Sequence, residues 1–101
     1  MIIRLIKPYN TKGLDADANI FYEIIKKINN EIDVKISSED EILKNPPLQK
    51  DDIHIYISNT SKEILKYAKI KMFMINHELF FQKEADLEIL KDLDYILARN
   101  N

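Results

Sequence analysis

The chain has 101 residues, 46% hydrophobic and 32% charged, which is the composition of one small globular domain with a single core. Its 15 basic and 17 acidic residues are mixed along the sequence, and without a basic stripe we expect no nucleic-acid partner. The absence of cysteine excludes disulfides, thiol catalysis and cysteine metal sites. Arg4 and Lys7 interrupt the first apolar run, so we predict no signal peptide, no membrane span and a cytoplasmic protein.

The first third of the chain predicts a strand, a helix and a second strand. Residues 2–6 are mostly apolar and are followed by Pro8, which ends a central strand. A loop with the only glycine, Gly13, leads to a predicted helix from about Asp17 to Asn29. Asp15 or Asp17 can cap that helix, and residues 32–36 alternate between apolar and polar as in a strand with one wet face. The predicted core stripe of the helix is Ile20, Phe21, Ile24, Ile25 and Ile28.

The remainder continues the alternation of helices and strands. Capping boxes that begin at Ser38 and Thr60 predict short helices through about Lys44 and Tyr67 or Ala68. Residues 52–58 predict a strand with isoleucines on one face and polar or aromatic side chains on the other. The continuous apolar run at 70–75 predicts a strand buried on both faces. A helix at about 85–90 and a strand at 95–98 complete the pattern.

This order of elements predicts one α/β domain spanning residues 1–101. We expect a Rossmann-like open parallel sheet of about five strands with helices on both faces. Strands 2–6 and 70–75 are apolar on both faces, which favours placing them side by side in the 3-2-1-4-5 order. The alternative, 2-1-3-4-5, would put the strand with His54 and Tyr56 at the centre, and we favour it less.

Two segments are candidates for a functional site because ligands of such sheets bind beyond the carboxyl ends of strands. Asn76, His77 and Glu78 directly follow the run at 70–75, and His77 could transfer a proton. A polar turn is the simpler interpretation of these three residues, and we favour it on the sequence alone.

The loop between the first strand and the first helix is the other candidate. With one glycine it lacks a pyrophosphate cradle, and Asp15 and Asp17 would repel an anion at the helix start, so we expect no nucleotide cofactor there. Asp15, Asp17 and Asn19 would suit hydroxyl-rich ligands such as sugars, although helix capping alone also explains these aspartates. The two histidines, His54 and His77, form no metal-binding spacing, so no metal is predicted.

Three stretches together resemble a known family. They are residues 17–21 (DANIF), 67–80 (YAKIKMFMINHELF) and 93–100 (LDYILARN). They are similar to the N-terminal domain of group 1/4-like glycosyltransferases of the GT-B type, in which an apolar strand runs into Pro-Asn-x-Glu-Trp-Phe. This chain departs from that pattern at Ile75, at Leu79 and at residues 98–100, where the family has Pro, Trp and a Lys-Thr ending.

The resemblance implies a glycan acceptor as partner and a set of acceptor-side residues. These would be Gly13, Asp17, Asn19, Asn76 and Glu78. GT-B enzymes hold the sugar-nucleotide donor mainly in a C-terminal domain, so the resemblance implies that these residues alone do not transfer sugar. Glycosyltransferase activity would require completion by such a domain.

The strand at 95–98 would leave an apolar sheet edge, Tyr95–Ala98, without a neighbour. Continuation of the chain into a further domain, a protein partner or a second copy could cover it. A stand-alone Rossmann-like interaction module that oligomerises or binds a protein through this strand is therefore the alternative function. A small enzyme that uses His77 and Glu78 as an acid–base pair is a third, weaker hypothesis.

Overall fold

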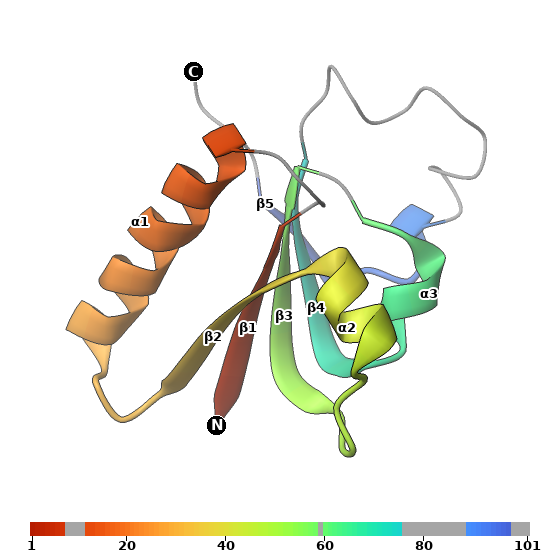
Figure 1. Cartoon of the computed structure of the whole chain (residues 1–101), viewed down its shortest axis with the longest axis horizontal. Coiled ribbons are helices and arrows are strands. Elements are labelled where there is room, and N and C mark those ends of the chain that lie inside the picture. Colours follow the sequence, from red (N-terminus) through yellow and green to blue (C-terminus); the bar gives the residue numbers. More distant parts are fainter. Residues whose placement is uncertain (8–11, 59, 76–88, 98–101) are drawn as a thin grey trace.

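A computed structural model describes residues 1–7, 12–58, 60–75 and 89–97, and it confirms the predicted α/β fold. The described elements, in chain order, are β1 (Ile2–Lys7), α1 (Lys12–Ile28), β2 (Asp33–Ser38), α2 (Glu39–Lys44), β3 (Asp51–Ser58), α3 (Lys62–Leu65), β4 (Ala68–Ile75) and β5 (Tyr95–Leu97). The five strands form one parallel sheet, with α1 on one face and α2 and α3 on the other (Figure 1).

The strand order is β2-β1-β3-β4-β5, so the predicted 3-2-1-4-5 order is wrong. β3 lies between β1 and β4, with Leu5 beside Ile55 and Ile55 beside Met72. The prediction failed because it treated the side chains of His54 and Tyr56 as too polar for a central strand. Both are fully buried, because hydrogen bonds described below satisfy their polar atoms.

Right-handed crossovers explain which helices cover which face of the sheet. The chain moves from β1 to β2 in one direction and from β2 through β3 to β4 in the other. The same handedness therefore places α1 on one face and α2 and α3 on the opposite one. The topology also fixes a switch point between β1 and β3, where the chain reverses its direction across the sheet.

α1 begins at Lys12, about five residues earlier than predicted. Asp15 and Asp17 therefore lie inside the helix, and the prediction that one of them caps it is wrong. Side chains of Ala18, Phe21, Tyr22 and Ile25 pack on the sheet. The predicted five-residue core stripe is only partly correct, because three of its members are largely exposed: Ile20 at 58%, Ile24 at 48% and Ile28 at 78%.

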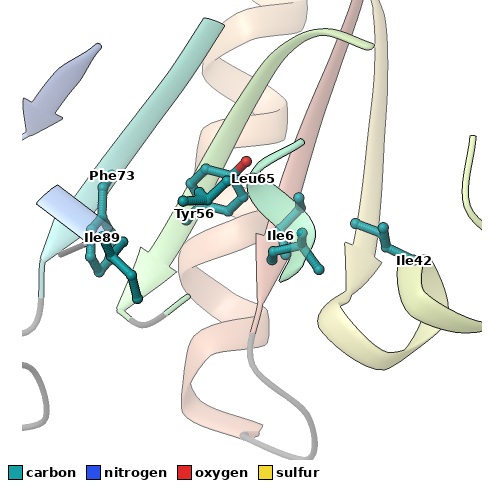
Figure 2. Close-up of a cluster of buried hydrophobic side chains, with 7 residues drawn as sticks. Ile6, Ile42, Tyr56, Leu65, Phe73 and Ile89 are labelled. Atoms are coloured by element: carbon teal, nitrogen blue, oxygen red, sulfur yellow. The ribbon is translucent and has the colours of Figure 1, made fainter. Parts of the chain in front are cut away.

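The opposite face of the sheet carries the second half of the core. Ile6, Tyr56 and Phe73 lie side by side in register on β1, β3 and β4. Figure 2 shows them beneath Ile42 of α2 and Leu65 of α3. Ile64 and Ile89 complete the buried cluster. β1 and β3 are therefore packed on both faces, as expected for inner strands of a parallel sheet, and β4 is packed on this face.

α2 ends at Lys44, as predicted, whereas α3 is shorter than predicted. Ser38 is the N-cap of α2, and its hydroxyl donates to carboxylates of Asp40 at 2.6 Å and Glu41 at 2.9 Å. α3 has Ser61 as its N-cap and ends at Leu65, two or three residues before the predicted end. Residues 85–88 of the last predicted helix lie outside the described residues.

Among the described residues, no helix combines the length and apolar character needed to cross a membrane.

Candidate functional site

The carboxyl edge of the sheet is the site that the sequence predicts. β1 ends at Lys7 and α1 begins at Lys12, so the start of α1 lies close to the carboxyl end of β1 (Figure 1). β4 ends at Ile75 on the same edge, immediately before Asn76. One strand separates β1 from β4, which corresponds to about 10 Å at the usual spacing of neighbouring strands.

The predicted acceptor residues are distributed over this edge as follows. Gly13 and Asp17 belong to the first two turns of α1, but the side chain of Asp17 lies outside the described part of the structure. Asn19, two residues after Asp17 and thus about half a turn further along, is exposed. Asn76 and Glu78, together with the proton-transfer candidate His77, lie outside the described residues. The topology brings the start of α1 and the end of β4 to one edge, next to the switch point.

A second group of polar side chains, which the sequence did not predict, lies within the sheet. Its centre is Asp51, at the start of β3, which is only 3% exposed. One oxygen of Asp51, Oδ2, accepts hydrogen bonds from Nε of Arg4 at 2.7 Å and from Nε2 of His54 at 2.6 Å. A terminal nitrogen of Arg4 also donates to Oγ of Ser37 at 2.8 Å. The group links the three strands β2, β1 and β3.

The contacts of His54 determine which ring nitrogen carries its proton. The ionised carboxylate of Asp51 can only accept, so Nε2 of His54 is the donor and Nδ1 is free to accept. The hydroxyl of Tyr56 lies 3.3 Å from Nδ1 and donates to it. The two rings meet edge to face, with centroids 5.7 Å apart. The neutral form of His54 therefore satisfies both of its nitrogens.

Burial sets the pKa values of this group. Desolvation lowers the pKa of His54, and the opposing effect of Asp51 does not outweigh it. Desolvation alone would raise the pKa of Asp51, but the hydrogen bonds and positive charge of Arg4 and His54 hold it below the ordinary value of 3.8. Burial, with the nearby charges of Asp51 and Asp94, raises the pKa of Tyr56. Near neutral pH, Asp51 is ionised while His54 and Tyr56 are neutral.

Arg4 and His54 of this group belong to a row of nitrogen-bearing side chains that crosses the sheet. Lys35, Arg4, His54 and Lys71 occupy register positions on the neighbouring strands β2, β1, β3 and β4. Asp51 compensates the charge of Arg4 at the centre of the row. The group is consequently best understood as an internal brace that holds the central strands in register, since its titratable atoms are buried and mutually bonded.

A small pocket of about 190 Å³ opens beside Arg4, and Ser37, Glu41, Ile42 and Asn45 complete its lining. Asp51 already neutralises Arg4, and Glu41 adds negative charge, so the pocket has no net positive charge to attract an anion. The hydroxyl and amide of its lining suit water or a small neutral polar molecule. Among the described residues, no group of His, Asp and Glu is arranged to hold a metal ion.

One sequence signal could have indicated the buried group. Arg4 interrupts the otherwise apolar run at 2–6, and the predicted strand at 52–58 places His54 and Tyr56 on a single face. A charged residue in a strand that must be buried on both faces needs a partner of opposite charge. The sequence offers 17 acidic residues, and only the fold selects Asp51.

No protein-family model matches this chain, and no curated protein is similar to it at a significant level.

Proposed function

We propose that this chain is the acceptor-side, N-terminal domain of a GT-B-type glycosyltransferase, and that it depends on a separate donor-binding domain for sugar transfer. The observation that carries the proposal is the shared carboxyl edge: β1, which leads into α1, and β4 are separated by one strand there, beside the switch point. The family-like motif at 17–21 lies in α1, and the described part of the motif at 67–80 includes β4.

The chemistry of the first turns of α1 supports a sugar over a nucleotide. Asp15 and Asp17 lie within the first two turns of the helix, where their negative charges oppose binding of a phosphate. Carboxylates accept hydrogen bonds from hydroxyl groups, and side-chain amides both accept and donate them. An acceptor glycan therefore fits this edge better than a sugar nucleotide.

The strand order differs from the 3-2-1-4-5 order of a Rossmann-like half, and one missing edge strand would account for the difference. If strand 3, at the edge of a 3-2-1-4-5 sheet, is removed, the order 2-1-4-5 remains. Numbering the four remaining strands along the chain turns this order into 2-1-3-4. That is the order of the first four strands here. A Rossmann-like half that lacks its third strand accounts for the difference from the predicted order without any change at the switch point.

The proposal is tested by glycan binding measured by NMR on the isotope-labelled chain. We expect amide shifts at residues 12–19 and 76–78, and Asp17→Asn or Glu78→Gln should weaken binding about 10- to 100-fold, as for loss of a hydrogen bond to a charged group. Asp33→Asn, at the opposite edge of the sheet, is the matched control and should bind normally. Failure of the wild-type chain to bind any member of a broad glycan panel would reject the proposal.

A second candidate function is a module that binds a protein partner through β5. This strand pairs with β4 on one side, and on it Tyr95 is 57% and Ile96 53% exposed. No other described strand pairs with β5, and an edge of this kind can accept a strand from another protein. Ile96→Lys should abolish such binding, and a partner that binds this variant as tightly as the wild type would exclude β5 pairing.

A further inference from the structure

The face of the sheet that carries α1 is only partly covered. α1 packs on β1, β2 and β3, and the other described helices lie on the opposite face (Figure 1). One packed helix occupies about 10 Å, the width of roughly two strands. Among the described elements, none covers β4 and β5 on this face.

The side chains on the uncovered part are apolar. Ile70 and Met72 of β4 point to the same face as the core residues beneath α1. Tyr95 of β5 is in register with Met72 and therefore shares that face. Ile70 is 38% exposed, and Tyr95 is more than half exposed, so these three residues form an apolar floor that solvent reaches.

The exposed isoleucines of α1 form a wall beside this floor. Ile20, Ile24 and Ile28 recur every four residues and so lie along one side of the helix. Lys26, about 200° around the helix from Ile24, bonds through Nζ to the carbonyl of Ile32 at 2.6 Å, next to the start of β2. The isoleucine side of α1 therefore faces away from β2, toward β4.

We infer that a second copy of this chain covers the apolar surface formed by Ile20, Ile24, Ile28, Ile70, Met72 and Tyr95, which we call the α1–β5 trough. A two-fold axis parallel to α1, midway between two facing sheets, places α1 of each copy over β4 and β5 of the other. Ile24 of the two copies then meet across the axis. The surface is self-complementary, as a two-fold interface requires, because helix and trough lie side by side on one face.

The area of the trough is sufficient for such a dimer. Five of its six side chains are more than a third exposed, and at about 100 Å² each they give on the order of 500 Å² per copy. Two copies would bury roughly 1,000 Å², the lower bound of a specific protein interface. The patch of roughly 500 Å² on one copy is also near the upper end of the range found for the largest exposed apolar patch of a monomer.

The first test is the mass of the chain in solution by analytical ultracentrifugation. We expect a dimer of twice the 11.9 kDa chain mass, and Ile24→Lys or Tyr95→Lys should weaken association at least tenfold. Ile96→Lys is the matched control: Ile96 adjoins Tyr95 but points to the opposite face, so the dimer should persist. All three side chains are about half exposed, so the variants should fold, which their thermal melting verifies.

A single introduced cysteine provides the second test, because the chain contains none. Ile24→Cys should form an intermolecular disulfide across the axis, while Leu48→Cys, on the exposed loop before β3, should not. At a chain concentration of about 0.5 mM, even a dimer with a millimolar dissociation constant is detectable. A chain that is still monomeric at this concentration would overturn the inference. A dimer broken by Ile96→Lys alone would also overturn it. The α1–β5 trough does not include the carboxyl edge of the sheet. The test for a dimer and the test for glycan binding can therefore fail independently of each other.

Discussion

Removal of the carboxylate of Asp51 should destabilise the fold more than removal of its sequence neighbour Asp52. Asp51→Ala leaves the guanidinium of Arg4 and the Nε2 proton of His54 without their common acceptor. Breaking a buried ion pair by removing one partner costs about 3–5 kcal/mol. We expect about 3 kcal/mol, because Arg4 retains some contact with solvent, 16% of its side chain being exposed. The total free energy of unfolding of a domain of this size is about 5–15 kcal/mol.

Urea unfolding followed by circular dichroism measures this loss. At an m-value of about 1 kcal/mol/M, a loss of about 3 kcal/mol lowers the midpoint by about 3 M. Asp52→Ala is the control: Asp52 accepts from the backbone N–H of Ile2 at 2.8 Å but is far more exposed, so its midpoint should move much less. Equal shifts for the two variants, or a loss below about 1 kcal/mol for Asp51→Ala, would refute the view of Asp51 as a buried brace.

Three further outcomes are expected from the same group of residues. Because the pKa of His54 is lower in the folded than in the unfolded chain, stability should be complete above pH 6.5 and fall below it, by at most about 1.4 kcal/mol per pH unit. His54→Gln should remove this slope between pH 7 and pH 5 in urea titrations, and an unchanged slope would contradict it. Tyr56→Phe should cost about 1 kcal/mol through the lost hydroxyl contact, and calorimetry that finds no change would make the 3.3 Å contact energetically irrelevant. Arg4→Met combined with Asp51→Ala should cost less than the two single changes added together, since the two residues form one ion pair; strict additivity would argue against it.

The sequence was sufficient for the fold class and most element positions because periodicity reports local burial. The continuous run at 70–75 and the alternation at 52–58 correspond to β4 and β3. Strand order is not a local property, and it depended on whether His54 could be buried. The burial of His54 depends on its hydrogen bond to Asp51, which is three residues away in sequence. Asp51 contacts its second partner, Arg4, only when β1 pairs with β3.

The candidate site was predictable to a similar extent. Parallel strands bring the end of β4 and the start of α1 to one edge regardless of strand order, so this arrangement followed from the alternation alone, while the acceptor role of the residues there stays a prediction. The internal brace did not follow, because no sequence spacing connects Arg4 with Asp51. The exposure of Ile20, Ile24 and Ile28 was also missed, since a helix with a wide apolar surface does not reveal how much of it one sheet will cover.

The central position of β1 has a consequence for synthesis of the chain. β1 is made first, yet its neighbour β3 begins about 50 residues later, a delay of about 2–10 s at ordinary translation rates. Until then β1 can pair only with β2, and its other edge, in an apolar segment of high strand propensity, can associate with other nascent chains. Arg4 places a charge in the middle of that segment, as residues that suppress aggregation do. The same guanidinium that later pairs with Asp51 thus keeps the emerging strand in solution.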